Sequence, residues 1–195
     1  LLIIETMTDL YEVREAIAAA RQVAAYLPII ASMTFTRDDR TLLGDDPVKV
    51  ARAMHGYGAD VLGVNCSGGP NQLLRILKAM REAVPDGKFS VMPNAGWPQQ
   101  VGGRIMYPAE PEYFGEYALS LWNSGADVLG GCCGTTPEHI AAMTRALESA
   151  VERANSEREA AEMLEPDEPQ QSVQQTTGLG QKLAEGRFVV AVEMD

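Results

Sequence analysis

The protein has 195 residues, of which 46% are hydrophobic and 22% are charged, and its formal net charge is −11. This composition is ordinary for a globular protein with one substantial core, and the negative charge disfavours nucleic acid and anionic membranes as partners because both would repel it. No apolar run approaches the roughly 18 residues that a membrane-spanning helix needs. The three cysteines fit a reducing compartment rather than a disulfide framework, so we expect a cytoplasmic protein without membrane association.

Short apolar segments alternate along the chain with longer amphipathic segments. In chain order, strands are predicted at residues 1–4, 28–32, 59–65, 89–92 and 126–129, and helices at 10–26, 47–56, 70–84, 111–124 and 137–154. The helix after Asp46 has a carboxylate cap and a proline, Pro47, in its first turn, and both favour helix initiation. Residues 99–110 contain too many glycines and prolines for regular structure and are predicted to form a long loop.

This alternation amounts to five strand–helix units. Such units build parallel sheets, because the crossover between two parallel strands has about this length. Two architectures satisfy the pattern. One is an open doubly wound sheet, and the other is part of a (βα)8 TIM barrel, which takes about 250 residues as a whole.

The three cysteines stand where predicted strands end. Cys132 and Cys133 lie in the sequence GGCCGTTP, and Cys66 lies in VNCSGGP. The carboxyl ends of parallel strands share one edge of a sheet, so three thiols can converge there, and the flanking glycines permit the bend that brings two adjacent thiols to one ion. Three protein ligands and one free position are typical of a catalytic zinc. The alternative is a set of unreactive buried cysteines; a disulfide is disfavoured because one cysteine would stay unpaired and a bond between adjacent residues is strained.

Polar side chains end the other predicted strands in the same way. The residues concerned are Glu5, Ser32, Asn65 and Asn94. Barrel enzymes build their active sites at this edge. Polar residues also accumulate at strand ends without a function, which is the alternative for the serine and the asparagines. His55 and His139 lie on predicted helices and are predicted to be structural.

These segments resemble the zinc-binding signature of the homocysteine S-methyltransferase family. The matching segments, in the family's order, are Glu5-Thr6, Ser32-Met33-Thr34-Phe35, Asn65-Cys66, Pro93-Asn94-Ala95-Gly96 and Gly130-Gly131-Cys132-Cys133-Gly134-Thr135. The resemblance implies a (βα)8 TIM barrel, of which residues 1–154 carry units four to eight, with the first three expected upstream. It also implies that Cys66, Cys132 and Cys133 bind a zinc ion that activates the thiol of homocysteine.

The resemblance implies roles for the other strand-end residues as well. Glu5 is a candidate for binding the ammonium group of homocysteine, and the Ser32 segment is a candidate for part of the pocket. Asn94 is expected near the metal, where its amide oxygen either fills the vacant zinc position or only shapes the turn. Sulfur ligands favour alkyl transfer to a thiolate, whereas histidine or water ligands suit hydrolysis.

The predicted activity is therefore zinc-dependent methyl transfer to homocysteine, which forms methionine. The methyl donor stays open between S-methylmethionine, S-adenosylmethionine and methyltetrahydrofolate, directly or through cobalamin. Two alternative functions are a metal-free barrel enzyme with incidental cysteines and a non-catalytic module stabilised by zinc.

The composition changes after the last predicted helix. Six acidic residues and one arginine fall between Asn155 and Thr177, and a linker is predicted at 155–178. Residues 179–195 resemble the opening of the methylenetetrahydrofolate reductase family, where a strand ends in a catalytic glutamate, here Glu193. This resemblance implies the start of a second TIM barrel covalently linked to the first. FAD and NAD(P)H are expected only for the part of that reductase domain outside this chain.

Overall fold

The structure is a computed structural model that describes the backbone of residues 1–164 and the side chains of residues 1–156. Its contacts divide the chain into two compact units, Leu1–Asn155 and Ser156–Asp195. The first unit holds the sheet and all of the predicted site residues except Glu193. The predictions for residues 165–195, the reductase-like segment included, lie outside the described residues.

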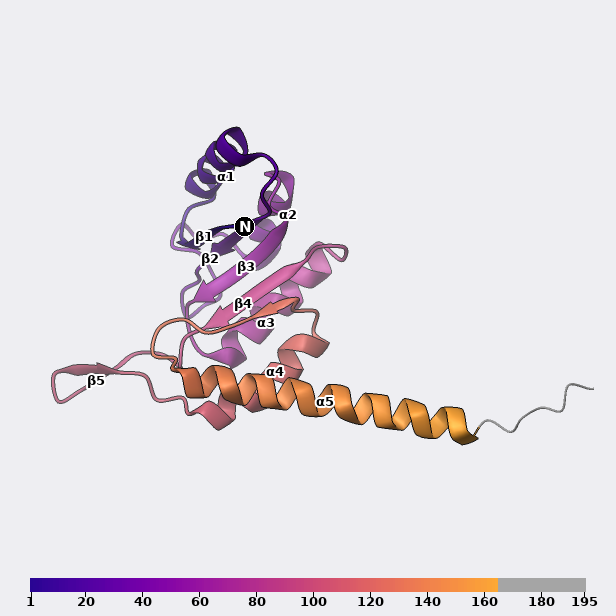
Figure 1. Cartoon of the computed structure of the whole chain (residues 1–195). Coiled ribbons are helices and arrows are strands. Elements are labelled where there is room, and N and C mark those ends of the chain that lie inside the picture. Colours follow the sequence, from indigo (N-terminus) through magenta and orange to yellow (C-terminus); the bar gives the residue numbers. More distant parts are fainter. Residues whose placement is uncertain (165–195) are drawn as a thin grey trace, which may run out of the picture. The chain divides into compact units, whose positions relative to one another are not determined.

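A five-stranded parallel sheet forms the centre of the first unit (Figure 1). Its strands are ordered β1-β2-β3-β4-β7, so neighbours in the sheet follow one another along the chain, interrupted only by a separate hairpin. The strands are β1 (Leu2–Met7), β2 (Ile29–Met33), β3 (Val61–Cys66), β4 (Phe89–Pro93) and β7 (Val128–Leu129), and the helices are α1 (Leu10–Ala24), α2 (Pro47–Gly56), α3 (Pro70–Ala83), α4 (Pro111–Asn123) and α5 (Pro137–Leu164). The prediction of five βα units is confirmed.

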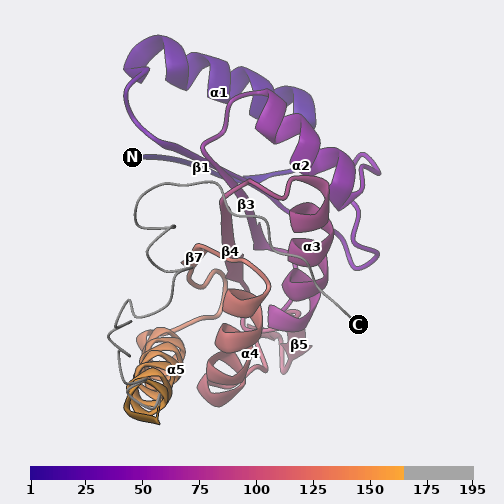
Figure 2. The same cartoon turned by 90° about the vertical axis from the view of Figure 1, so that its right-hand side faces the viewer.

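Helices α1 to α4 cover one face of this sheet. Figure 2 shows them following the same side of the curved sheet, and each packs on the next. Alternate strand residues join them in one core, among them Ile29, Ala31, Leu62, Val64, Phe89 and Val91. A doubly wound sheet has helices on both faces, whereas a TIM barrel has them on the outside only. The one-sided cover in the described residues therefore favours the barrel over the open sheet.

Small residues lie side by side on the opposite face of the sheet. Ser32, Gly63 and Ser90 lie in register on β2, β3 and β4. A Cβ atom at Gly63 would lie 1.9 Å from the hydroxyl oxygen of Ser32, so only glycine fits beside that serine. In a barrel this face is the interior.

The same six-residue sequence, GADVLG, leads into β3 and β7, at residues 58–63 and 125–130. In both copies the aspartate accepts a hydrogen bond from the backbone N–H of the first residue of a neighbouring strand. The two pairs are Asp60 with Ile29 and Asp127 with Phe89, each at 2.7 Å. Arg21 also forms an ion pair with Asp60, and this guanidinium, with the N–H bond, holds the pKa of the Asp60 carboxyl below its ordinary value.

The predicted loop at residues 99–110 is wrong over residues 99–106, where the chain forms a β-hairpin of β5 (Gln99–Val101) and β6 (Arg104–Met106). The two residues between these strands are Gly102 and Gly103, with φ angles of 57° and 78°. A two-residue hairpin turn of type I′ needs positive φ at both positions, which glycine adopts readily. The glycines thus mark the turn of a hairpin rather than an absence of regular structure.

Two element boundaries also differ from prediction. Helix α5 continues to Leu164, ten residues beyond its predicted end, because residues 156–164 are rich in Glu, Ala, Arg, Met and Leu, which favour helix. The first part of the predicted linker is therefore helical. Strand β1 extends past Glu5 to Met7, with a register shift against β2 between Ile4 and Met7.

None of the helices in the described part of the chain is both long enough and apolar enough to cross a membrane. In α5, which has 28 residues, nine residues are glutamate or arginine.

Candidate metal centre

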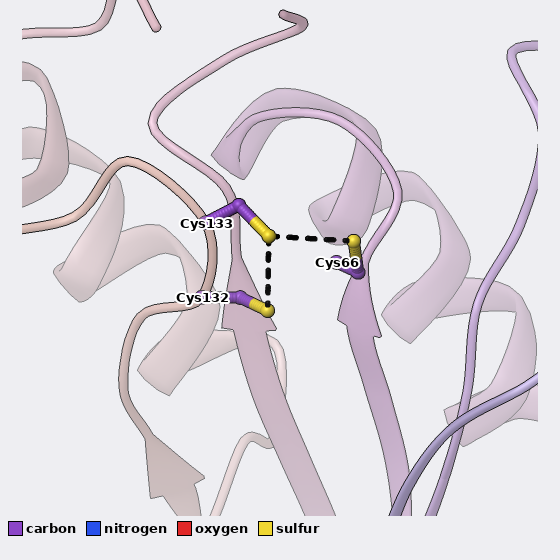
Figure 3. A group of neighbouring side chains, drawn as sticks. All are labelled: Cys66, Cys132 and Cys133. Carbon is purple, nitrogen blue, oxygen red and sulfur yellow. Dashed lines mark hydrogen bonds between the residues drawn. The ribbon is translucent and has the colours of Figure 1, made fainter.

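The three cysteine thiols converge at the carboxyl ends of β3 and β7 (Figure 3). Cys66 is the last residue of β3, and Cys132 and Cys133 follow β7 after two glycines. The Cys133 sulfur lies 4.0 Å from the Cys66 sulfur and 4.0 Å from the Cys132 sulfur, and all three lie within 4.8 Å of one another. The predicted convergence of the thiols at one sheet edge is therefore present, and none of them is in a disulfide.

The backbone bends sharply where β3 ends. Cys66 and Ser67 have φ angles of 59° and 58°, in the left-handed region that side chains rarely adopt. Each such residue costs about 1–3 kcal/mol. This bend takes Cys66 out of the alternating strand pattern and turns its sulfur toward the other two.

Surrounding bonds hold this strained turn in place. The Ser67 hydroxyl accepts a hydrogen bond from the backbone N–H of Phe35 at 2.7 Å and lies 3.1 Å from the Thr34 hydroxyl. It thereby ties the end of β3 to the segment after β2. Ser67 was not singled out from the sequence, because a serine before two glycines reads as an ordinary turn residue.

The second cysteine segment forms a compact turn of its own. The Cys132 N–H donates to the Pro93 carbonyl at 2.8 Å, which extends the pairing of β7 with β4. The Thr135 hydroxyl closes the turn by donating to the Cys132 carbonyl at 2.6 Å. Gly134 has a φ of 77°, and a Cβ atom there would lie 2.3 Å from the Tyr107 ring. The ring therefore rests directly on this glycine, and no larger residue fits.

Tyr107 brings an aromatic hydroxyl to the edge of the cluster. Burial, and then the neighbouring Cys133 thiol, raise the pKa of its phenol. The residue follows the hairpin strand β6, in a segment that the sequence analysis treated as an irregular loop. Its proximity to the cysteines had no signal in the sequence.

Asn94 joins the two cysteine segments. Its Oδ1 accepts the Cys133 backbone N–H at 2.9 Å, while its Nδ2 donates to the Ser67 carbonyl at 3.0 Å and to the Cys66 sulfur at 3.5 Å. The side chain is 3% exposed. The Asn94 amide therefore links the turn after β3 to the cysteine segment after β7.

Asn65 makes an equivalent connection on the other side of the cluster. Its Oδ1 accepts the Thr6 backbone N–H at 2.8 Å, and its Nδ2 donates to the Thr6 hydroxyl at 2.6 Å. The same Nδ2 lies 3.8 Å from the Cys132 sulfur. The sequence placed Asn65 at a strand end and assigned it no contact with the first strand.

The remaining predicted residues lie at different depths. Glu5 is exposed and its side chain makes no hydrogen bond or ion pair with the described residues, so its carboxylate is available to a ligand. Ser32 is 3% exposed and lies within β2 beside Gly63, without a hydrogen bond to the cysteines. The structure thus brings the cysteines and asparagines together, with Glu5 joined to them only through its neighbour Thr6.

The two histidines stay outside the cluster. His139 is 5% exposed; its Nδ1 accepts the Thr136 backbone N–H at 3.1 Å, which leaves Nε2 to donate to the Ala109 carbonyl at 3.0 Å. Both ring nitrogens therefore serve the packing of α5. His55 lies in the last turn of α2.

The distances between the thiols suit a metal ion. A tetrahedral zinc with Zn–S bonds of about 2.3 Å needs sulfurs about 3.8 Å apart, close to the two separations of 4.0 Å. Burial raises the pKa of the Cys132 thiol, and the two neighbouring cysteines raise it further. Metal binding by this cluster must therefore displace protons.

The amino-acid sequence is similar to those of known proteins. The family model described as homocysteine S-methyltransferase matches residues 1–147. The chain is 32% identical over 160 residues to the methionine synthase of Mycobacterium leprae (strain TN), covering 78% of this chain, and 32% identical over 153 residues to that of Mycobacterium tuberculosis (strain ATCC 25618 / H37Rv), covering 75%. It spans only 13% of the length of each of these two relatives.

Solved structures show the same fold. The apo form of the homocysteine methyltransferase MmuM from Escherichia coli has a TM-score of 0.58 at 24% identity, and the match covers 75% of this chain and 49% of that one. The metallated form has a TM-score of 0.54 at 25% identity, and the match covers 73% and 43%. The predicted architecture, about five βα units of a TIM barrel, is confirmed. From the family match over residues 1–147, the chain belongs to the homocysteine S-methyltransferase family.

Proposed function

We propose that this chain carries the metal centre of a zinc-dependent enzyme that transfers a methyl group to homocysteine and forms methionine. The observation that carries the proposal is the cluster of Cys66, Cys132 and Cys133, with two sulfur separations of 4.0 Å at the carboxyl ends of parallel strands. Its spacing fits a single tetrahedral zinc with a fourth position open.

The chemistry of the donor set supports methyl transfer. A free thiol with a pKa near 8.5 is mostly protonated at pH 7 and is a poor nucleophile. Zinc, when bound, supplies a deprotonated sulfur at neutral pH. Cys66, Cys132 and Cys133 would hold the metal as three thiolates, and the resulting negative charge would leave electron density on a substrate thiol for attack on a methyl carbon.

The chain's own residues divide the remaining work. Asn94 and Asn65 hold the cysteine segments in position through the bonds described above. The exposed carboxylate of Glu5 is suited to bind the ammonium group of homocysteine, and Ser32 is proposed to line the pocket beneath it. MmuM, which is a homocysteine methyltransferase by name, has been solved in a metallated form, and this supports metal binding by a chain of the same fold.

The proposal does not name the methyl donor, because the chain spans only 13% of the methionine synthases and about half of MmuM. We further propose, from the sequence resemblance alone, that residues 179–195 open a covalently linked reductase domain that uses FAD and NAD(P)H, with Glu193 as its catalytic glutamate. Flavin absorbance in the purified intact protein tests that fusion. The free cysteines support a reducing location, which we propose to be the cytoplasm.

The decisive experiment measures metal and activity together on the intact protein. We expect one zinc per cysteine cluster and an X-ray absorption spectrum with a sulfur shell near 2.3 Å. Homocysteine should be converted to methionine with one of the donors S-methylmethionine, S-adenosylmethionine or methyltetrahydrofolate. A shell of nitrogen and oxygen would overturn the proposal. Full activity after zinc removal would favour a metal-free barrel enzyme, and loss of the fold on zinc removal would favour a zinc-stabilised module.

A further inference from the structure

We propose that Asn65 is a positioning residue that couples the metal ligand Cys132 to the Glu5–Thr6 segment of β1. The inference rests on the proposed function, since it assigns the metal to Cys132 and the substrate's ammonium group to Glu5. In this arrangement one carboxamide sets both the sulfur end and the amino acid end of the substrate site.

The contacts of Asn65 use its side chain completely. It is 1% exposed, and Oδ1 accepts the Thr6 backbone N–H at 2.8 Å. A backbone N–H can only donate, so the oxygen must face Thr6, and the amide orientation is fixed without ambiguity. The two hydrogens on Nδ2 are then directed to the Thr6 hydroxyl at 2.6 Å and to the Cys132 sulfur at 3.8 Å.

The tether crosses the sheet in an unusual way. Asn65 is on β3 and Thr6 is on β1, and β2 lies between these strands in the sheet. The bond therefore passes over the end of β2 on the inner face, rather than following the ladder of the sheet. A side chain that only completed the sheet would bond to an adjacent strand.

Thr6 needs such a tether because its backbone is strained. Its φ is 60°, and the register of β1 shifts between Ile4 and Met7. A β-branched residue in the left-handed region is a true outlier that persists only where its surroundings impose it. The two bonds from Asn65 impose it, and they thereby fix the backbone that carries Glu5.

On the sulfur side, the Nδ2–H group acts on a metal ligand from outside the ligand shell. A hydrogen bond to a thiolate stabilises its charge and fixes its direction, and partners of this kind typically change metal affinity by about 10–100-fold when removed. Displacement of Thr6 by a bound ammonium group would move the same amide that touches Cys132. Substrate binding and metal geometry are therefore linked through one side chain.

Two variants separate the two arms of Asn65. Asn65→Asp keeps an oxygen for the Thr6 N–H, and the Thr6 hydroxyl can turn to donate to it, but the donor to Cys132 is lost. We expect about 10–100-fold weaker zinc binding in a chelator competition. We also expect altered sulfur-to-metal absorption bands in the cobalt-substituted intact protein, and a KM for homocysteine within about threefold of wild type at saturating zinc.

Thr6→Val removes the hydroxyl contact and keeps a β-branched residue of the same shape, so the backbone strain is unchanged. We expect the reverse pattern, with a KM for homocysteine raised about three- to tenfold and zinc binding within about threefold of wild type. Ser90→Ala is the matched control, because it removes a buried hydroxyl on the same face that has no hydrogen-bond partner. It should move neither quantity.

The inference fails if Asn65→Asp binds zinc as tightly as wild type with unchanged cobalt bands, or if Thr6→Val weakens zinc as much as it raises KM. Thermal melting confirms that each variant is folded, and if Asn65→Asp is unfolded, Thr6→Val alone decides the substrate arm. Failure of the proposed function is distinguishable, since then the wild-type protein itself binds no zinc or makes no methionine.

Discussion

At both ends of the sheet, side chains accept hydrogen bonds from backbone N–H groups, but only those at the carboxyl ends also contact the cysteines. At the amino ends, Asp60 and Asp127 each accept the N–H of an adjacent strand, and neither has a positive φ angle. At the carboxyl ends, Asn65 and Asn94 likewise accept backbone N–H groups, but each also donates toward a cysteine sulfur. An amide side chain also carries N–H donors, whereas a carboxylate carries none. The asparagines can therefore donate to the cysteine sulfurs while they accept hydrogen bonds from the backbone.

Backbone strain also differs between the two ends of the sheet. Three of the four non-glycine residues with positive φ, namely Thr6, Cys66 and Ser67, lie at the carboxyl edge, as counted over the described residues. Strain of this kind, about 1–3 kcal/mol per residue, collects at functional sites. The strained residues therefore lie at the edge of the sheet where the three thiols meet.

The largest effect is expected from removing one of the three thiols at the carboxyl ends of the strands. Cys66→Ser, Cys132→Ser and Cys133→Ser should each abolish methyl transfer and reduce zinc occupancy, because a serine hydroxyl stays protonated and is a poor zinc ligand. The packed sheet below the cluster should keep its fold. Zinc analysis, activity and a thermal melt test this, and retained activity in any one variant removes that residue from the site.

The next effect concerns the asparagine that joins the two cysteine segments. Asn94→Ala leaves the Cys133 N–H and the Ser67 carbonyl without their partner, and it should weaken zinc binding by about 10–100-fold. It should also lower the free energy of unfolding by about 1–3 kcal/mol. Asn71→Ala, at an exposed asparagine, is the matched control. An Asn94→Ala protein with wild-type zinc affinity would show that Asn94 does not position the thiols.

A smaller effect is expected at the amino ends, and it should leave the metal site untouched. Asp60→Ala should lower the free energy of unfolding by about 1 kcal/mol, since it removes a partly exposed ion pair and the acceptor of the Ile29 N–H. Asp86→Ala, at an exposed aspartate, is the control. Altered zinc affinity in Asp60→Ala would contradict the separation of the two ends.

The same variant gives a pH test. The pKa of Asp60 is lowered from 3.8 in the folded protein, mainly by Arg21 and then by the Ile29 N–H. Its charged form therefore adds stability above pH 3.8, and this contribution is lost as the pH falls through the folded pKa. The difference in unfolding free energy between wild type and Asp60→Ala should be constant near neutral pH and shrink below about pH 4.

The smallest effect should come from the turn of the β5–β6 hairpin, whose glycines take no part in the contacts compared above. Gly102→Asn produces an Asn-Gly turn, the preferred pair for a type I′ hairpin, so unfolding free energy should stay within about 0.5 kcal/mol of wild type. Gly102→Val, at a φ of 57°, should cost more because a β-branched residue strains the turn. Equal stability of the two variants would contradict the type I′ geometry.

Features that depend on the local sequence pattern could be predicted from the sequence. Apolar periodicity located the five strand–helix units, and cysteines at two strand ends predicted the cluster, because parallel strands bring their ends together. The hairpin at 99–106 was missed because its glycines were read as breakers, although two adjacent glycines between short strands are also a turn signal. The end of α5 was missed because acidic composition was given more weight than helix propensity.

Contacts between distant segments could not be predicted in this way. Nothing local to Asn65 indicates that its partner is Thr6, 59 residues away, or that both lie on the inner face. The repeated GADVLG sequence was a detectable signal, yet its meaning depends on the order of strands in the sheet. Roles for Glu5, Ser32 and Glu193 stay predictions.

Three free thiols within 4.8 Å also make the empty site sensitive to oxygen. Cys133 is exposed, so oxidants reach it directly, and a sulfenic acid formed there has a second thiol within 4.0 Å with which to condense. A bound metal engages all three sulfurs and blocks this route. Zinc-free protein kept in air should therefore lose titratable thiols and recover its metal binding only after treatment with a reductant. In a cell, the supply of zinc would then protect the site from oxidation as well as completing it.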